Sequence, residues 1–250
     1  AMTALPLVTI GMTCFNAQAT IARALRSALA QDWPNKQIIV VDDASADDSV
    51  GTVRALAAAH PEIRLIAHDH NKGVGGALNT MLAHAHGEFV VIFDDDDESA
   101  PERIATQLRA LTDYEARTGQ KLVACYASGV RVYPNGYEHH FAGIGSRPRA
   151  PQGQDMLDYF FYGRRDPAVF YGAGTPGCAL MARRATFQAA GSYDETLRRN
   201  EDSDFAVRLA KIGGHFTGCA EEVVRQHATA GSDKRPLIAY KSECAFIDKY

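Results

Sequence analysis

The stretch EFVVIFDDDDESAP, from Glu88 to Pro101, joins a run of apolar residues to four consecutive aspartates. The apolar part has the length and composition of a buried β-strand, so the aspartates lie where that strand ends. Neighbouring carboxylates repel one another, and at neutral pH they are tolerated only when solvated, partly protonated or neutralised by a cation. The stretch therefore predicts either an acidic surface turn or a divalent metal site, and the surrounding sequence must distinguish them.

Three similar units of strand and helix precede this stretch. The expected strands are Leu7 to Phe15, Gln37 to Val41 and Ile63 to His68, and the expected helices cover 16–31, 49–60 and 77–86. This alternation predicts a mainly parallel sheet with helices on both faces, in which ligands bind beyond the carboxyl ends of the strands. Asp42 and Asp43, the glycine-rich turn NKGVGG (71–76) and the four aspartates all follow strands. Their convergence on one edge favours a binding site over a solvated turn.

The second half of the chain has a less regular pattern. Pro101 is expected to start a helix that reaches Thr118, and a strand or hairpin is expected over 121–133. The residues 135–154 are rich in glycine, proline and arginine and are predicted to form a loop. A short aromatic helix (155–163), a strand leading into a helix (178–191) and an amphipathic helix (200–214) complete the expected elements.

The composition fits one α/β domain and argues against several functions. The chain has 250 residues, 46% of them hydrophobic, and its formal net charge of -4 gives no global attraction to nucleic acid. Its five cysteines show no metal-finger spacing, so reduced thiols and a cytoplasmic location are expected. No apolar run reaches the roughly 20 residues that span a bilayer, so association with the inner membrane face would be peripheral, through parts not present.

The aspartate run has the chemistry of a site for Mn²⁺ or Mg²⁺. These hard cations take oxygen ligands and are usually held by one or two carboxylates together with phosphates of the substrate. Residues two apart lie on one side of an extended chain, which directs Asp94 and Asp96 to the same side. A diphosphate is therefore the expected partner of the metal.

At four places the sequence resembles the inverting GT-A glycosyltransferases of family 2. The matching segments run from the opening VTIGMTCFNAQATIARALRSALAQDWPNKQIIVVDDASADDS through NKGVGGALN and FDDDDESAPERI to GSYDETLRRNEDSDFAVRLAKIG, followed by a late histidine in VRQH. They occur in the family's order, from Val8 to about Gly231. The resemblance implies a GT-A fold in a single domain, 1–250. Its halves would be a Rossmann-like nucleotide-binding sheet flanked by helices (about 5–100) and an acceptor-binding, catalytic half (about 101–235), with a C-terminal helix at 236–250.

The resemblance also implies residues that hold a nucleotide-sugar donor. Asp42 or Asp43 would bond the base, Asp95 the ribose, and Asp97 would cap the following helix. Leu78 replaces an arginine that many relatives carry, and Lys72 is expected to act in its place, beside Gly73. The metal would be held by Asp96 and Asp94, with His227. The nucleotide would lie among Thr13, Phe15 and Asn16.

The resemblance places the catalytic groups in the segment NEDSD. Asp202 matches the general base that takes the proton of the acceptor hydroxyl, and Glu201 would support the acceptor side. Without the other motifs, these acids would suit the first turn of a helix for electrostatic reasons alone. Around His227, the candidates for diphosphate clamps or lid residues are Arg225, Lys234 and Arg235. For the last two, ordinary solvated charge is the slightly favoured interpretation.

The implied function is metal-dependent transfer of a hexose or N-acetylhexosamine, with inversion, from a nucleotide donor. A UDP-sugar is the expected donor, and a glycan or lipid-linked saccharide of a cell-surface polysaccharide is the expected acceptor. Two alternatives stay open. A sugar-1-phosphate nucleotidyltransferase has a similar sheet and metal site, although GMTCFNAQAT lacks its basic phosphate loop. A non-catalytic, receiver-like module is suggested by VVDDAS, although the NEDSD segment argues against it.

Overall fold

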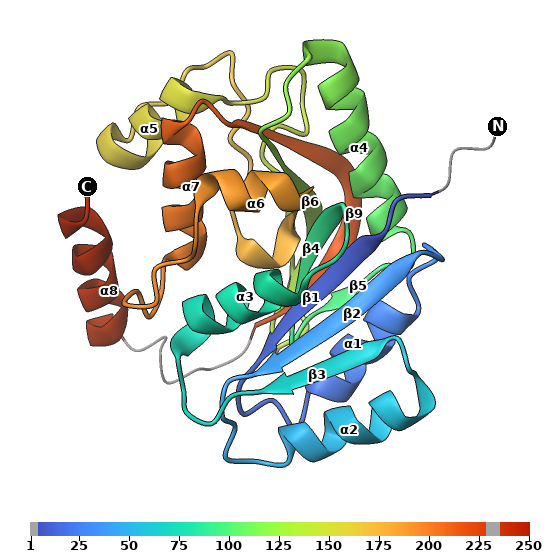
Figure 1. Cartoon of the computed structure of the whole chain (residues 1–250). Coiled ribbons are helices and arrows are strands. Elements are labelled where there is room, and N and C mark those ends of the chain that lie inside the picture. Colours follow the sequence, from blue (N-terminus) through green and yellow to red (C-terminus); the bar gives the residue numbers. More distant parts are fainter. Residues whose placement is uncertain (1–4, 229–235) are drawn as a thin grey trace.

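The computed structural model describes residues 5–228 and 236–250, and within these it contains one nine-stranded sheet (Figure 1). The strand order is β3-β2-β1-β4-β8-β6-β9-β5, and β7 pairs with β6 outside this path. The strands are β1 (Val8–Cys14), β2 (Lys36–Asp42), β3 (Ile63–Ala67), β4 (Phe89–Asp94), β5 (Glu98–Ser99), β6 (Val123–Val132), β7 (Glu138–Phe141), β8 (Leu180–Arg183) and β9 (His215–His227).

The first half of the sheet is parallel, as predicted. β1 pairs in parallel with both β2 and β4, and β2 pairs in parallel with β3, so these strands all end at one edge. Cys14 is paired with Asp42, and Thr13 with Asp94, which brings the two acidic strand ends beside the end of β1. The predicted convergence of the polar strand ends is therefore present.

The second half of the sheet is mixed. β8 runs antiparallel to both β4 and β6, whereas β9 runs parallel to β6. The strand β7 lies inside the segment predicted as a loop, so that prediction was wrong for Glu138–Phe141. These residues are largely polar and exposed, and an edge strand of this kind lacks the apolar alternation that makes a strand visible in a sequence.

Helices cover both faces of the sheet. One face packs against α1, α2 and α4 through a core that includes Ile10, Leu25 and Ile104, and the other packs against α3, α5, α6 and α7. The helices are α1 (Ile21–Leu29), α2 (Ser49–Ala59), α3 (Gly73–His84), α4 (Arg103–Thr118), α5 (Gly153–Tyr162), α6 (Arg184–Ala190), α7 (Glu201–Lys211) and α8 (Pro236–Asp248), with a short 3-10 turn, η1 (Gly177–Ala179). None of the helices in the described ranges has both the length and the apolar character needed to cross a membrane.

The glycine-rich turn forms the beginning of α3. The helix starts at Gly73, earlier than predicted, and the loop after α6 passes directly over it. A Cβ atom on Gly75 would lie 3.0 Å from the carbonyl oxygen of Asp194, closer than most Cβ contacts, so a larger residue would require this loop to shift. The contact brings the segment that precedes α7 to the carboxyl edge of the parallel strands.

Candidate active site

Two adjoining pockets open at the carboxyl edge of the sheet. The α3 pocket, of about 650 Å³, is lined by the ends of β1, β2 and β4, the start of α3 and the segment 198–202. The acidic pocket, of about 510 Å³, is lined by Asp94, Asp96 and Asp97, the turn at Gly177 and the end of β9. Arg199, Glu201 and Asp202 line both pockets. The predicted catalytic segment thus lies at the boundary between them.

Asp43 organises the α3 pocket, whereas Asp42 does not line it. The carboxylate of Asp43 accepts the backbone N–H groups of Lys72 and Gly73, each at 2.8 Å, and contacts Nδ1 of His68 at 2.8 Å. The carboxylate of Asp42 is buried and accepts both the N–H and the hydroxyl of Ser45. Of the two candidates for the base contact, only Asp43 faces the pocket.

The other residues predicted to contact the nucleotide also form two groups, those that line the α3 pocket and those that do not. Thr13, Phe15, Gly73 and Asp95 line the α3 pocket, and the carboxylate of Asp95 accepts the N–H of Phe15 at 3.0 Å. The side chain of Asn16 accepts the N–H of Ala46 and so holds the neighbouring loop instead. Asn16 and Lys72 are not among the lining residues.

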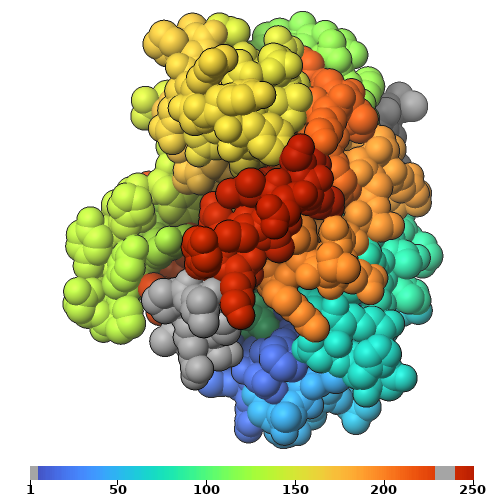
Figure 2. Space-filling view, turned by 90° about the vertical axis from the view of Figure 1, so that its left-hand side faces the viewer, coloured from blue at the N-terminus to red at the C-terminus, as the bar shows by residue number. Residues whose placement is uncertain are grey.

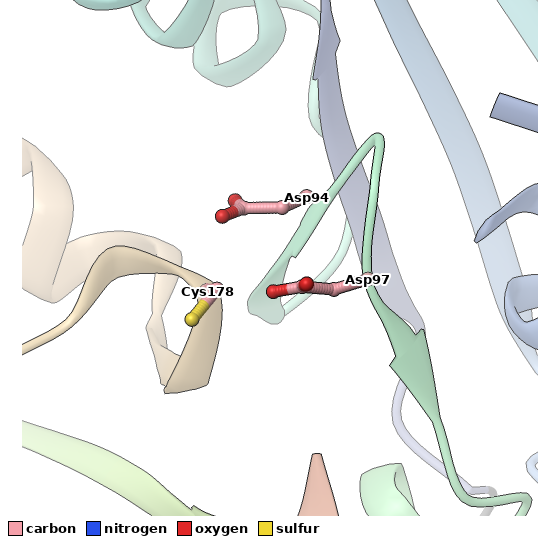
Figure 3. A group of neighbouring side chains, drawn as sticks. All are labelled: Asp94, Asp97 and Cys178. Atoms are coloured by element: carbon pink, nitrogen blue, oxygen red, sulfur yellow. The ribbon is translucent and has the colours of Figure 1, made fainter. Parts of the chain in front are cut away.

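The acidic pocket contains a group of three possible metal ligands, shown in Figure 3. One carboxylate oxygen each from Asp94 and Asp97 and the sulfur of Cys178 all lie within 4.8 Å of one another. Asp94 was predicted as a ligand, but Asp97 and Cys178 were not. Asp96 and His227 line the same pocket without joining this group. Within the described residues, the predicted ligand set is therefore only partly brought together.

Asp97 does not cap the following helix, which corrects its predicted role. The helix α4 begins at Arg103 with Glu102 as its N-cap, because the short strand β5 follows Asp97 first. Asp97 instead accepts the N–H of His227 at 2.8 Å, and Nε2 of His227 lies 2.7 Å from a carboxylate oxygen of Glu98. Burial, with a contribution from neighbouring Asp94, raises the pKa of Asp97 to about 8.

A buried arginine lies beneath the acidic pocket. The guanidinium of Arg103 donates to the hydroxyl of Ser99, the carbonyl of Ile92 and the side chain of Gln107, each at 2.9 Å. Gln107 in turn donates to the carbonyl of Ala179 at 2.8 Å. These hydrogen bonds connect the end of β4, where the aspartates begin, to the η1 turn that contains Cys178.

The catalytic candidates occupy the first turn of α7. Asp202 accepts the N–H of Ser203 at 2.7 Å and is also bonded by the backbone N–H of Gly177. Burial raises the pKa of Asp202 despite these bonds. Burial and neighbouring Asp202 raise the pKa of Glu201 to about 7. Carboxyls whose pKa values lie nearer to neutrality are suited to proton transfer.

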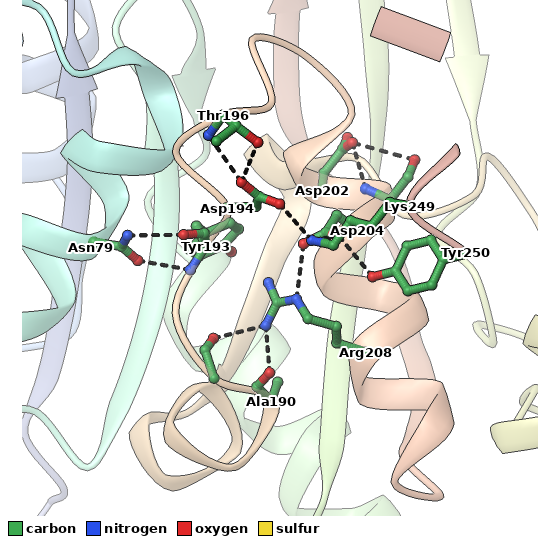
Figure 4. A network of polar contacts seen from close by, with 12 residues as sticks. Asn79, Ala190, Tyr193, Asp194, Thr196, Asp202, Asp204, Arg208, Lys249 and Tyr250 are labelled. Atoms are coloured by element: carbon green, nitrogen blue, oxygen red, sulfur yellow. Dashed lines mark hydrogen bonds and ion pairs between the residues drawn. The ribbon is translucent and has the colours of Figure 1, made fainter. Parts of the chain in front are cut away.

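The first turn of α7 is anchored from behind by the fully buried carboxylate of Asp204 (Figure 4). Arg208 donates to Asp204 at 2.8 Å, and near the end of the sequence Lys249 and Tyr250 contact it at 2.5 and 2.7 Å. Lys249 also pairs with Asp194 in the loop before α7. In Figure 2 the red helix α8 lies across α7 and α5 on this face of the molecule. The position of the first turn of α7 therefore depends on contacts with the two residues that follow α8.

A family model described as Glycosyl transferase family 2 matches residues 9–186. The chain belongs to glycosyl transferase family 2. Over 99 residues, this family 2 chain is 41% identical to succinoglycan biosynthesis protein ExoO of Rhizobium meliloti (strain 1021), covering 40% of the chain and 28% of ExoO. Over 247 residues it is 26% identical to the putative glycosyltransferase EpsE of Bacillus subtilis (strain 168), covering 97% of the chain and 80% of EpsE.

Solved structures confirm the predicted GT-A fold of the family 2 chain. The crystal structure of S. aureus TarS 1-349 in complex with UDP-GlcNAc matches with a TM-score of 0.67 at 18% identity, covering 90% of this chain and 59% of the TarS 1-349 chain. The mannosyltransferase PcManGT from Pyrobaculum calidifontis, in complex with GDP-Man and Mn²⁺, matches with a TM-score of 0.64 at 23% identity, covering 97% of this chain and 62% of PcManGT. The chain thus spans about three fifths of each of these two crystallised chains.

Several functional candidates of the family 2 chain were not assigned from its sequence. Arg198 and Arg199 line the α3 pocket, and Arg198 donates to the side chain of Asn71 at 3.0 Å. Their position directly before the NEDSD segment, which begins at Asn200, was a signal that could have identified them. Arg225 instead pairs with Glu138 at 2.7 Å, away from the lining of either pocket. Lys234 and Arg235, the other proposed clamps, lie outside the described residues.

Asp95→Asn is expected to stabilise the metal-free family 2 chain at about pH 8 and to change its stability little near pH 4. Burial raises the pKa of Asp95 from its ordinary 3.8 to about 7. The folded state therefore binds this proton more tightly than the unfolded state, and ionisation becomes increasingly destabilising from pH 3.8 to about 7. Asparagine cannot ionise, and its oxygen still accepts the N–H of Phe15.

The measurement is urea unfolding of both chains in a chelating buffer at several pH values. The difference in the free energy of unfolding between variant and native chain should grow with pH. A difference that does not depend on pH would contradict the assignment.

Proposed function

We propose that this family 2 chain transfers a sugar from a nucleotide diphosphate donor to a hydroxyl group of a saccharide acceptor during polysaccharide synthesis. The observation that carries this proposal is the position of Glu201 and Asp202, which line both the α3 pocket and the acidic pocket. A base at this boundary can reach an acceptor hydroxyl while the two pockets hold the parts of the donor. The name of ExoO, a succinoglycan biosynthesis protein, supports the polysaccharide context.

The α3 pocket is the proposed site of the nucleoside. Asp43 offers an acceptor to the imide N–H of uracil, and Asp95 offers one to a ribose hydroxyl. The aromatic ring of Phe15 is half exposed at the same edge, where it can pack against the base. The complex of TarS with UDP-GlcNAc supports a UDP-sugar donor, whereas PcManGT binds GDP-Man. The Asp43 carboxylate suits the imide N–H of uracil, and on this ground and the likeness to TarS we propose a UDP-sugar carrying a hexose or an N-acetylhexosamine.

The acidic pocket fits a divalent cation such as Mn²⁺ or Mg²⁺. Its carboxyls are crowded and buried enough to raise the pKa values of Asp97 and Glu201, and a cation relieves such crowding. Asp94 and Asp97 offer the hard oxygen ligands that these ions prefer. Asp96 and His227 also line this pocket. Bound there, the ion would supply Lewis-acid stabilisation of the charge on the departing diphosphate.

The chain's own residues then perform the proton transfer. Asp202 takes the proton of the acceptor hydroxyl as its oxygen forms a bond to the anomeric carbon. The bond from that carbon to the diphosphate oxygen breaks at the same time, and its electron pair leaves with the diphosphate. Because attack comes from the side opposite the leaving group, the anomeric configuration is inverted. Glu201 orients the acceptor, and the arginines Arg198 and Arg199 offer positive charge on the donor side.

The proposed organisation is a single GT-A domain over 1–250. In this proposal, residues of about 5–100 bind the nucleotide, 101–235 carry the acceptor and catalytic groups, and 236–250 form a C-terminal helix. A lipid-linked saccharide is a suitable acceptor, which would place the protein in the cytoplasm at the inner face of the membrane.

A donor screen tests the proposed function. The chain is incubated with Mn²⁺, a panel of UDP-, dTDP- and GDP-sugars and a panel of saccharide acceptors, and release of the nucleoside diphosphate is measured. Release from a UDP-sugar that depends on both acceptor and metal is expected. Formation of pyrophosphate from UTP and a sugar 1-phosphate would instead identify a nucleotidyltransferase, and no binding of any nucleotide sugar would contradict the proposal.

Asp43→Ala is expected to weaken the binding of UDP by about 10- to 150-fold, because a hydrogen bond to a charged group contributes about 1.5–3 kcal/mol. The change removes the acceptor proposed for the base and also releases the N–H groups of Lys72 and Gly73 at the start of α3. The dissociation constant of UDP is measured by titration calorimetry. Asp69→Ala, at an exposed site in the preceding loop, is the control and should bind UDP normally. Equal affinities for the two variants would exclude Asp43 from the nucleoside site.

A further inference from the structure

The sulfur of Cys178 is directed into the same space as two carboxylates of the acidic pocket. Figure 3 shows the three side chains near one another, on two separate segments: the end of β4 with the turn that follows it, and the η1 turn. One carboxylate oxygen from Asp94, one from Asp97 and the sulfur lie within 4.8 Å of one another. The Cys178 side chain is buried, at 5% exposure, so the sulfur faces this group and not bulk solvent.

Burial, together with Asp94 and Asp97, raises the pKa of the Cys178 thiol well above its ordinary value, and two neighbours act against this effect. Nε2 of Gln226, at the end of β9, donates to the sulfur at 2.7 Å. The buried guanidinium of Arg103 lies close enough to contribute favourable electrostatic energy to a charged sulfur. Arg103 and Gln107 also join Ile92, which precedes the aspartates, to Ala179, which follows Cys178. The two segments that carry the three groups are thereby held in one arrangement.

The mixed donor set has a different metal preference from a set of oxygens alone. Carboxylates suit Mg²⁺ and Mn²⁺, whereas a thiolate is a soft ligand that favours ions such as Zn²⁺ and Cd²⁺. A thiol that coordinates such an ion does so as a thiolate and gives its proton to solvent. Replacing one oxygen ligand by sulfur therefore changes which divalent ions compete for the site.

We propose that Cys178 is a direct ligand of the metal in the acidic pocket, beside Asp94 and Asp97, and that its sulfur gives the site a preference for thiophilic divalent ions over Mg²⁺. This inference rests on the proposed function, because that proposal is the reason for placing a cation in this pocket. It adds a sulfur ligand that the aspartate motif does not contain.

A buried thiol that only fills space is the alternative, and the chain offers a matched example. Cys219 is also buried, at 3% exposure, but its sulfur donates to the carbonyl of Glu221 in its own strand at 3.8 Å. The metal-ligand group found among the described residues does not include Cys219. Cys219→Ser therefore controls for the general effect of replacing a buried thiol by a hydroxyl.

The first experiment is a titration of the full chain with Co²⁺, followed by near-ultraviolet absorption. The native chain and Cys219→Ser are expected to develop an intense sulfur-to-cobalt charge-transfer band at one equivalent of Co²⁺. Cys178→Ser is expected to bind Co²⁺ without that band, and circular dichroism checks that it is folded. Binding of Co²⁺ to the native chain without the band would overturn the inference, and this measurement does not depend on any variant.

The second experiment compares metal affinities by calorimetry. We expect the affinity of Cys178→Ser for Cd²⁺ to fall by about 10-fold or more, which is the size of effect that changes around a metal site produce. Its affinity for Mg²⁺ should change little. Equal losses for both ions would indicate a general distortion of the pocket and would overturn the inference.

The two proposals can fail separately. Sugar transfer with Mn²⁺ in a native chain that shows no sulfur-to-cobalt band would overturn the role of Cys178 and leave the proposed function intact. A native chain that binds none of these ions would overturn the role of Cys178 and the metal site of the proposed function together.

Discussion

Asp202→Asn is expected to retain donor binding and to lose sugar transfer by about 10²- to 10⁴-fold, the usual contribution of a positioned general base. Asparagine has nearly the same shape, and its oxygen can still accept the N–H groups of Ser203 and Gly177. It cannot accept the proton of the acceptor hydroxyl. The effect should therefore appear in kcat, while the dissociation constant of the donor stays close to that of the native chain.

The measurement combines steady-state transfer kinetics with calorimetric titration of the nucleotide. Asp113→Asn, at an exposed position of α4, is the matched control and should leave both quantities unchanged. Transfer by Asp202→Asn at the native rate would remove Asp202 from the role of base. A parallel loss of donor binding would indicate that Asp202 holds the donor instead.

Arg103→Leu is expected to destabilise the chain by several kcal/mol. The substitution leaves the carbonyl of Ile92, the hydroxyl of Ser99 and the side chain of Gln107 without their buried donor, and each such group costs about 1–3 kcal/mol. It also removes the positive charge that faces Asp94 and Asp97. The guanidinium packs on the ring of Phe93 at 4.4 Å, so that contact is lost as well.

Urea unfolding of the metal-free chain measures this effect, with Arg109→Leu as the control on the same helix. Arg109 is exposed and pairs with Glu221 at 3.2 Å, and a surface ion pair of this kind contributes about 0–1 kcal/mol. The two variants should therefore differ clearly in the midpoint of unfolding. Similar midpoints would show that Arg103 does not support the strand end that carries the aspartates.

The parallel half of the fold and its binding edge were predictable because they depend on local patterns. The strands β1, β2 and β4 are largely apolar runs, and each is followed by polar residues that the parallel topology brings together. The placement of Asp43 and Asp95 at one edge follows from this topology, whereas their roles toward the base and the ribose came from the family resemblance. The choice between Asp42 and Asp43 could not be predicted from the sequence, because it depends on which carboxylate accepts the hydroxyl of Ser45.

The metal-ligand group was only partly predictable because it joins distant segments. Asp97 was assigned to a helix cap, since the two-residue strand β5 is too short to leave a pattern in the sequence. Cys178 follows a glycine and proline segment that carries no metal-binding spacing. Its position beside Asp94 depends on the antiparallel pairing of β8 with β4, a long-range contact that residue periodicity does not contain.

The contact between Asp204 and the two residues that follow α8 has a practical consequence for protein production. Lys249 and Tyr250 reach the buried carboxylate behind the first turn of α7, so a purification tag fused directly to Tyr250 would compete with this contact. A tag placed ahead of Leu5 would instead join the chain near the start of β1, at the edge of the sheet opposite the pockets. Assays of transfer should therefore use an amino-terminal tag, and a drop in turnover after moving the tag to Tyr250 would report on the anchoring of α7.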